Sequence, residues 1–190
     1  MYTLPLPPVL FIAGKKKSGK DFLADTFVTE FGYAKLHIAE PWLRAWFAAK
    51  GLNPDEWETL KTQHRTEIQK DAQVARDESG GRALLVGLHN RVEDLLLTHE
   101  GVAVSGVRFI NEGQFAMQNG YFVVRVDTGD ETRRQRFIDS EESLKLFDDP
   151  FEHEVNLLPC HIIVSGEEAG WKQPYIVATG YSTLMRYRRA

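Results

Sequence analysis

Short apolar runs alternate along the chain with longer stretches in which apolar residues recur at helical spacing. Five of the runs predict buried β-strands, at Val9–Ala13, Tyr33–Ala39, Val102–Val107, Tyr121–Asp127 and His161–Val164. The intervening stretches predict helices at Phe22–Phe31, from Pro41 to a break at Gly51–Pro54, and at Asp55–Arg76, Ala83–Thr98, Asn111–Asn119 and Thr132–Phe147. Strands that alternate with helices predict an α/β fold, in which a five-stranded parallel sheet carries helices on both faces.

The length of the chain limits the number of domains. With 190 residues it can form one α/β domain with a sizeable core but not two ordinary ones. We therefore expect a single domain over residues 1–190, with its core at about residues 9–166. The tail Trp171–Ala190 does not show the pattern of a closing helix.

Charge and composition argue against several partners. The formal net charge is -4, so we expect no nucleic-acid or membrane partner, and any anion must be bound by local clusters of cations. The sequence shows no signal-peptide pattern and no apolar run long enough to span a bilayer. Cys160 is the only cysteine, which favours a reducing compartment. We expect a cytoplasmic protein, either a monomer or a homodimer.

A segment rich in glycine and lysine follows the first predicted strand and opens a predicted helix. Its spacing is G-x-x-x-x-G-K, and in this context backbone N–H groups can surround a phosphate. The residues expected to bind ATP are Gly14, Lys15, Lys16, Lys17, Ser18, Gly19, Lys20, Asp21 and Phe22. Lys20 would reach the β- and γ-phosphates. The alternative is a lysine-rich turn capped by Asp21 at the start of a helix.

Asp21 occupies the position at which such loops usually carry Ser or Thr, whose hydroxyl binds Mg²⁺. A carboxylate can hold the ion directly or through water, because Mg²⁺ prefers oxygen ligands and keeps several waters. It also adds negative charge beside the phosphates, which a bound cation would offset. We therefore expect ATP and Mg²⁺ as cofactors, with Asp21 as the metal ligand.

Lys61, Arg65 and Arg76 form a cationic cluster on the predicted Asp55–Arg76 helix. At 3.6 residues per turn, Arg65 lies about 40° and Arg76 about 60° from Lys61 around the axis, so all three share one face if the helix is continuous. This face borders the apolar side of the helix, which suits the binding of an anionic acceptor. A solvated face with charge pairs along the helix would explain the same pattern.

A second group of arginines comprises Arg125, Arg133, Arg134 and Arg136. Arginines on a helical segment that closes over a site can supply the positive charge that phosphoryl transfer needs. The alternative is an ordinary charged helix, balanced by nearby acids.

Arg108 follows the third predicted strand. Ligands of open α/β sheets bind beyond the carboxyl ends of the strands, so Arg108 is expected to face the site. It could bind a phosphate of the acceptor, or pair with Glu112. His37, His153 and His161 show no metal-binding spacing, and we interpret the segment around His153 as a solvated loop.

The phosphate loop Lys15–Phe22 resembles that of animal-type phosphomevalonate kinase and of the related bacteriophage and bacterial deoxynucleoside monophosphate kinases. Other segments between Val9 and Gly166 resemble the same superfamily in a consistent order. These are the spacing of Lys61, Arg65 and Arg76 on the acceptor-facing helix, the R-F-x-N-E segment Arg108–Glu112, the lid segment Thr132–Arg136, the acidic segment Asp148–Glu154 and the last strand Ile162–Gly166. The phosphate loop is a specific motif, whereas each of the other segments is weak evidence alone and supports the resemblance mainly in combination.

The resemblance implies a P-loop NTPase fold of the nucleoside monophosphate kinase type, use of ATP and Mg²⁺, and transfer to a phosphate already on a small acceptor. It assigns Lys20 to catalysis, together with Arg133 and Arg136 in a lid at about residues 128–150. The residues implied to bind the acceptor, on helices at about 41–98 and at the end of the third strand, are Lys61, Arg65, Arg76 and Arg108. Arg44, just after the second predicted strand, could also contact the acceptor. One departure is Gly106, which stands where the family usually has an acid. If that acid helps to hold Mg²⁺, either Asp21 must contribute more to binding the ion or the activity is weakened.

Three functions remain open. The Arg108–Glu112 segment favours a (deoxy)nucleoside monophosphate kinase, in which Trp42, Trp46 or Phe47 could stack on the base. The phosphate loop alone favours phosphomevalonate kinase. Gly106 supports a nucleotide-binding regulatory or degenerate protein with little turnover.

Overall fold

A five-stranded sheet forms the centre of the computed structural model, which describes residues 4–140, 147, 152–167 and 172–187. Its paired strands are all parallel, in the order β2-β3-β1-β4-β5. The strands are β1 (Val9–Ala13), β2 (Tyr33–His37), β3 (Gly101–Val107), β4 (Phe122–Asp127) and β5 (Ile162–Ser165). The strands and the parallel α/β arrangement expected from the sequence are confirmed.

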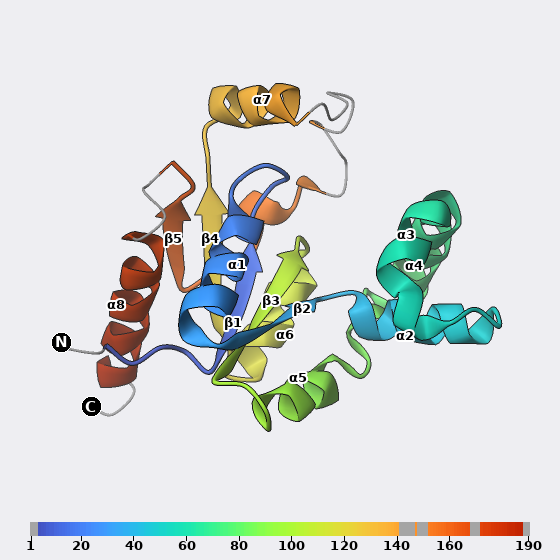
Figure 1. Cartoon of the computed structure of the whole chain (residues 1–190), viewed down its shortest axis with the longest axis horizontal. Helices are drawn as coiled ribbons and strands as arrows, with labels where there is room; N and C mark the ends of the chain where they lie inside the picture. Colours follow the sequence, from blue (N-terminus) through green and yellow to red (C-terminus); the bar gives the residue numbers. More distant parts are fainter. Residues whose placement is uncertain (1–3, 141–146, 148–151, 168–171, 188–190) are drawn as a thin grey trace.

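Helices cover both faces of the sheet and extend beyond one of its edges (Figure 1). They are α1 (Lys20–Phe31), α2 (Glu40–Ala49), α3 (Trp57–Gln63), α4 (Arg65–Ser79), α5 (Leu88–Leu96), α6 (Ile110–Gln118), α7 (Asp130–Asp139) and α8 (Lys172–Tyr187). In Figure 1 the carboxyl ends of the strands point towards α7, while α2, α3 and α4 lie together at the right. None of the described helices is long and apolar enough to cross a bilayer.

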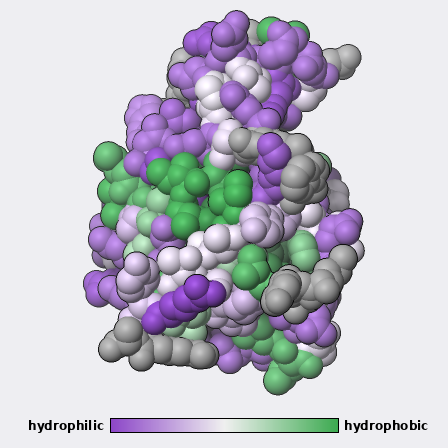
Figure 2. All heavy atoms as spheres, turned by 90° about the vertical axis from the view of Figure 1, so that its left-hand side faces the viewer, coloured by the Kyte–Doolittle hydropathy of each residue, from purple (hydrophilic) through white to green (hydrophobic). Residues whose placement is uncertain are grey.

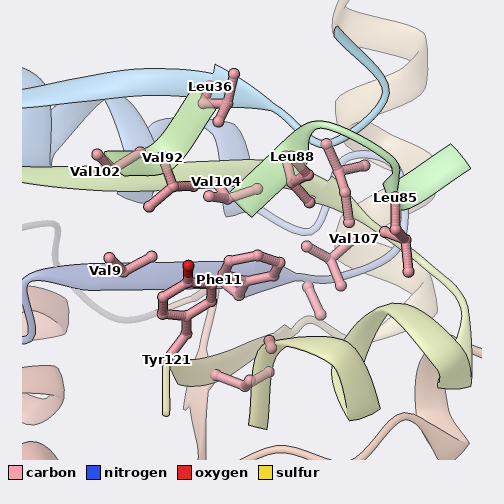
Figure 3. Close-up of a cluster of buried hydrophobic side chains, with 14 of the residues drawn as sticks. Val9, Phe11, Leu36, Leu85, Leu88, Val92, Val102, Val104, Val107 and Tyr121 are labelled. Carbon is pink, nitrogen blue, oxygen red and sulfur yellow. The ribbon is translucent and has the colours of Figure 1, made fainter. Parts of the chain in front are cut away.

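Alternate side chains of β1 enter two apolar layers. Val9 and Phe11 belong to the layer beneath α5 and α6, whereas Leu10 and Ile12 belong to the layer beneath α1 and α8. The ring of Phe11 stacks on Tyr121 with the ring centroids 5.4 Å apart (Figure 3). Both faces of β1 are therefore buried, which explains why its sequence is continuously apolar rather than alternating.

The helices α2, α3 and α4 form a third apolar cluster of their own, in which the buried members are Leu43, Phe47, Trp57 and Ile68. The single helix expected over Asp55–Arg76 is wrong, because the chain turns at His64 between α3 and α4. In a straight helix Trp57 and Ile68 would lie about 16 Å apart along the axis. The turn lets both pack in the same cluster, and the ring of His64 packs against Phe47.

The helix expected over Ala83–Thr98 is also shorter than predicted. Residues Arg82–Leu85 form a 3-10 turn, and α5 begins only at Leu88. Gly87 between them has a φ of 78°, a left-handed conformation that interrupts the helix.

The tail of the chain forms α8, contrary to the sequence-based expectation. Pro174 lies in its first turn, where a missing N–H costs nothing. Gly180 lies mid-helix, where a Cβ would come 2.8 Å from Ile162 Cγ2, so close packing on β5 explains this glycine. Figure 2 views the side of the molecule on which α8 lies; apolar residues gather in the middle of this face, and hydrophilic residues cover the end nearest α7.

Candidate active site

The loop between β1 and α1 has the backbone of a phosphate cradle. Gly14, Lys17 and Gly19 all have positive φ angles, and α1 begins at Lys20 without a side-chain cap, so the capped-turn alternative is not what forms. A Cβ on Gly14 would lie 2.5 Å from Ser18 Oγ, which leaves room only for glycine. The N–H groups in the first turn of α1 have no partner within the helix, so they can bind an anion in this loop.

Lys20 and Asp21 form an ion pair at this helix start, with Lys20 Nζ 3.2 Å from Asp21 Oδ2. Burial lowers the pKa of Lys20, and the nearby guanidinium of Arg108 lowers it further, while Asp21 opposes both. Burial alone would raise the pKa of Asp21, but Lys20 and Lys35 outweigh it and lower the pKa. Asp21 therefore keeps an ionised carboxylate, whose side chain is 62% exposed at the opening of the loop.

These residues fit ATP and a divalent ion. The hydroxyl of Ser18 is buried without a hydrogen-bond partner among the described residues, and a phosphate oxygen would supply one. No group of three or more His, Cys, Asp or Glu side chains in the described residues could hold a metal. Mg²⁺ in phosphate sites usually takes only one or two carboxylates, besides phosphate oxygens and waters, so Asp21 alone could serve as the protein ligand.

A cavity of about 540 Å³ lies beside the loop, between the ends of β4 and β5. Its walls include Lys15, Ser18, Thr128 and Ser165. The hydroxyl of Thr128 donates to the carbonyl of Ser18 at 2.6 Å, so the chain that follows β4 is fixed to the phosphate loop. This cavity can hold the part of the nucleotide that lies away from the reacting phosphate.

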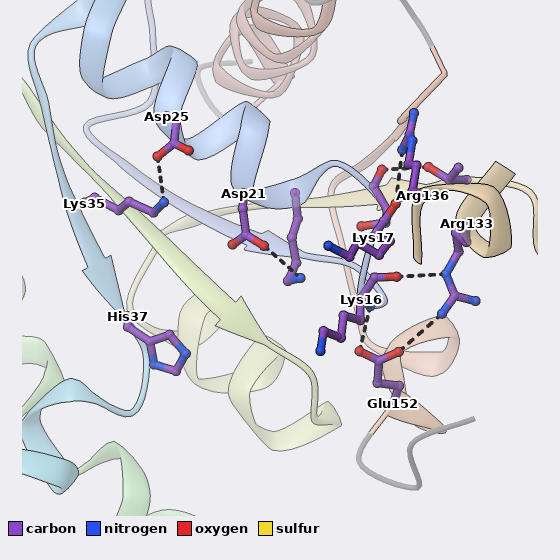
Figure 4. Close-up of polar contacts among 12 residues, drawn as sticks. Lys16, Lys17, Asp21, Asp25, Lys35, His37, Arg133, Arg136 and Glu152 are labelled. Carbon is purple, nitrogen blue, oxygen red and sulfur yellow. Dashed lines mark hydrogen bonds and ion pairs between the residues drawn. The ribbon is translucent and has the colours of Figure 1, made fainter. Parts of the chain in front are cut away.

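The two lid arginines of α7 bind the backbone of the phosphate loop (Figure 4). Arg133 Nε donates to the carbonyl of Lys16 at 3.0 Å, and Arg136 Nη1 donates to the carbonyl of Lys17 at 3.1 Å. Arg136 Nη2 also donates to the carbonyl of Gly166 at 2.8 Å. Both arginines thus fix the loop itself. The rest of the expected lid, apart from Phe147, lies at 141–150, outside the described residues.

Glu152 completes this network and was missed as a functional residue. Its carboxylate accepts the backbone N–H of Lys16 at 2.6 Å and pairs with Arg133 at 3.4 Å (Figure 4). It is 3% exposed, so the solvated loop expected here is wrong for Glu152, although His153 is exposed. Nothing local in the sequence links Glu152 to the phosphate loop 136 residues earlier.

A second cavity, of about 450 Å³, opens between the end of β3 and the helices α2, α3 and α4. Its cationic lining residues are Lys16, Lys61, Arg65, Arg76 and Arg108. Its apolar and aromatic lining residues include Trp42, Leu43, Ile68, Leu84 and Phe109. The turn at His64 therefore does not separate the cations expected on one helix face; α3 and α4 bring them to the same cavity.

Other predicted residues lie elsewhere. Arg44 pairs with Glu40 and with Asp55, at 2.9 and 2.7 Å, and is not among the residues that line either cavity. Phe22 is 57% exposed on α1 and lines neither cavity. Of the three aromatic residues considered for base stacking, Trp42 alone lines the second cavity; Phe47 is buried in the helical cluster and Trp46 donates to Asp71.

Gly106 and Glu112 each have a structural explanation. Glu112 accepts the backbone N–H groups of Arg108 and Phe109, at 2.7 and 3.1 Å, and so caps α6 and holds Arg108 at the cavity by its backbone. Gly106 has a φ of 84°, and a Cβ there would lie 2.7 Å from His37 Nε2. The ring of His37 thus occupies the space that a side chain at position 106 would need, and His37 is a cavity residue that sequence reasoning missed.

Comparisons with known proteins establish the fold and no more. No protein-family model and no curated protein matches the sequence. Among solved structures, TT1252 from Thermus thermophilus matches with a TM-score of 0.56 and 15% identity, over 95% of this chain and 98% of that one. Shikimate kinase from Bacteroides thetaiotaomicron matches with a TM-score of 0.50 and 14% identity, over 94% and 98%. The chain shares the fold of these structures, a five-stranded parallel sheet with helices on both faces and a phosphate loop between β1 and α1.

Proposed function

We propose that this protein transfers the terminal phosphoryl group of ATP to the phosphate of a (deoxy)nucleoside monophosphate and forms the diphosphate. The observation that carries the proposal is a cation-lined cavity next to the phosphate loop. Lys16 of the phosphate loop lines this cavity, and Arg108 of the same cavity lowers the pKa of Lys20, which supports neighbouring sites for the acceptor and the donor. Four cationic side chains, three on α3 and α4 and one directly after β3, suit an acceptor that already carries negative charge.

In this mechanism the protein positions two anions and stabilises the charge between them. An oxygen of the acceptor's phosphate attacks the γ-phosphorus in line, and the bond between γ-phosphorus and the β–γ bridging oxygen breaks to release ADP. No protein base is required, because the attacking oxygen is already ionised near neutral pH. Lys20 and the first-turn N–H groups of α1 hold the phosphates of ATP.

Charge neutralisation falls to Lys20 and to the ion that Asp21 would hold. Mg²⁺, when bound, neutralises charge that develops on the phosphates. Arg133 and Arg136 contribute by fixing the carbonyl side of the loop, which keeps its N–H groups directed at the nucleotide.

The walls of the cavity favour a nucleotide over a smaller acceptor. Trp42 supplies an aromatic ring to the cavity wall, and Phe109 lines the cavity with the guanidinium of Arg76 4.2 Å from its ring centroid. A volume of about 450 Å³ is within the range of roughly 300–1,000 Å³ typical of small-molecule sites. Phosphomevalonate remains the second candidate, supported by the phosphate loop. A nucleotide-binding protein with little turnover is the third candidate, and Gly106 supports it.

The proposal is tested by acceptor-dependent release of ADP from ATP and Mg²⁺, across all ribo- and deoxynucleoside monophosphates and phosphomevalonate. Lys20→Ala serves as the inactive control. Turnover with one or more nucleotides, lost in the control, supports the proposal and names the acceptor. Turnover with phosphomevalonate alone supports the second candidate. ATP binding without turnover of any acceptor supports the degenerate protein.

A further inference from the structure

His37 lies at the end of β2, and both of its ring nitrogens face hydrogen-bond donors. Its Nδ1 lies 3.2 Å from the backbone nitrogen of Ala39, and its Nε2 lies 3.2 Å from Lys61 Nζ. A backbone N–H and an ammonium group can only donate, whereas a neutral imidazole has one donor and one acceptor nitrogen. The ring can therefore accept from only one of these two neighbours.

The backbone of Ala39 is fixed by the turn after β2, so Nδ1 is the acceptor and the ring proton lies on Nε2. This N–H then faces the ammonium of Lys61, and none of the described residues supplies an acceptor between the two donors. Protonation of the ring would worsen the conflict. Burial lowers the pKa of His37 to about 3; Lys61, Arg108 and Lys20 lower it too, and Asp21 opposes them.

A third donor belongs to the same part of the cavity. Arg108 Nε is buried and has no hydrogen-bond partner among the described residues. Arg108 lines the cavity with His37 and Lys61, and it is close enough to lower the pKa of both. Figure 4 shows the ring of His37 directed from the end of β2 into the site, on the side of Asp21. Three N–H donors thus line one cavity, and none of the described residues accepts a hydrogen bond from Arg108 Nε.

We propose that His37, Lys61 and Arg108 form one oxyanion subsite, in which His37 Nε2–H donates to an oxygen of the acceptor's phosphate. An anionic oxygen between His37 and Lys61 accepts from both, which converts two opposed donors into two charge-assisted hydrogen bonds. The subsite extends the proposed function, on which it rests for the identity of the acceptor.

Gly106 is part of the same arrangement. Any side chain there would displace the ring of His37, because its Cβ would lie 2.7 Å from Nε2, and an acidic one would also add negative charge beside the donors. The neutral imidazole instead leaves the charge of Lys61 available to the ligand. The glycine that departs from the resembled family is therefore a condition for this subsite.

The first test observes His37 itself. Protein labelled with ¹⁵N-histidine is titrated with inorganic phosphate, and potassium chloride at equal ionic strength serves as the control; His37→Phe identifies the signal. We expect the Nε2–H tautomer at neutral pH and a saturable shift of its Nε2 resonance with phosphate. The Nδ1–H tautomer, or a resonance that responds equally to chloride, would overturn the subsite.

The second test uses two replacements of the ring. His37→Phe keeps a ring against Gly106 but has no N–H, whereas His37→Gln has an amide nitrogen at the same number of bonds from Cα as Nε2. Loss of one hydrogen bond to an anion is expected to raise the acceptor KM of His37→Phe roughly 10- to 100-fold. The acceptor KM of His37→Gln should return most of the way to the wild-type value. Wild-type KM in His37→Phe would overturn the subsite and leave the proposed function standing. If no acceptor is turned over, the phosphate titration still decides whether His37 belongs to an anion-binding subsite.

Discussion

Arg133 and Glu152 form an ion pair that is almost entirely enclosed beside the phosphate loop. Arg133 Nη2 lies 3.4 Å from Glu152 Oε2, and the two side chains are 1% and 4% exposed. Glu152 also accepts the N–H of Lys16, while Arg133 donates to the carbonyl of the same residue. Lys16 is thus held on both sides of its peptide backbone by residues 136 and 117 positions away in the sequence.

Glu152→Gln is expected to destabilise the protein, because it leaves the buried guanidinium of Arg133 without one of its counter-charges. Loss of one partner of a buried ion pair typically costs about 3–5 kcal/mol, and Asp130, which also pairs with Arg133, should keep the loss near the lower value. The free energy of unfolding in urea measures it. Glu131→Gln removes an exposed carboxylate of the same region and should change stability by less than about 0.5 kcal/mol. Equal effects of the two variants would contradict the buried pair.

Gly14→Ala is expected to abolish ATP binding. Its new methyl group would meet Ser18 Oγ at 2.5 Å and the carbonyl of Val126 at 2.8 Å, so the loop would have to open. Gly51→Ala is the matched control, since Gly51 also has a positive φ but nothing within 4 Å of the new atom. The control should cost about 1 kcal/mol of stability and leave ATP affinity unchanged, as measured by calorimetry.

Arg76→Gln is expected to raise the KM for the acceptor roughly tenfold or more with little change in the KM for ATP, because Arg76 lines the acceptor cavity. Arg44→Gln removes an equal charge from α2, where Arg44 pairs with Glu40 and Asp55 instead. Its acceptor KM should stay within about threefold of the wild type, since its loss leaves the cavity unchanged. A larger effect in Arg44→Gln would place the acceptor nearer to α2 than the cavity indicates.

The stability of the protein is expected to depend on pH through His37. Its pKa is about 3 in the folded protein and near 6.5 in the unfolded chain, so the unfolded chain binds more protons between these values. Stability therefore rises with pH through this window and is lost as the pH falls. Between pH 7 and pH 5, His37 should account for a loss of about 2 kcal/mol, which His37→Phe should not show in urea denaturation. An identical pH dependence in both proteins would mean that His37 titrates normally.

Local patterns predicted the strands and the phosphate loop because both depend on residues close together in the sequence. Five apolar runs became five strands, and the G-x-x-x-x-G-K spacing became the loop before α1. The tail helix was missed because Pro174 and Gly180 have poor helix propensity, and their tolerance depends on helix position and on packing against β5.

The candidate site was predicted only where its residues come from recognisable segments. Lys61, Arg65, Arg76 and Arg108 do line one cavity. Glu152 and His37 were missed, because the role of each depends on a partner distant in sequence. His37 meets Gly106 and Lys61, and Glu152 meets Lys16, only after the sheet has assembled. Arg44 shows the opposite case. The sequence suggested that it could contact the acceptor, but in the structure it pairs with Glu40 and Asp55.

The separate apolar cluster of α2, α3 and α4 has an evolutionary consequence. Leu43, Phe47, Trp57 and Ile68 hold these helices to one another, whereas the two layers on the sheet have other members. Substitutions on the cavity side of α3 and α4 can therefore change the lining of the second cavity while the sheet and the phosphate loop keep their packing. Under the proposed function, a chain built in this way would diversify its acceptors by changing one small helical module and would conserve its phosphate donor.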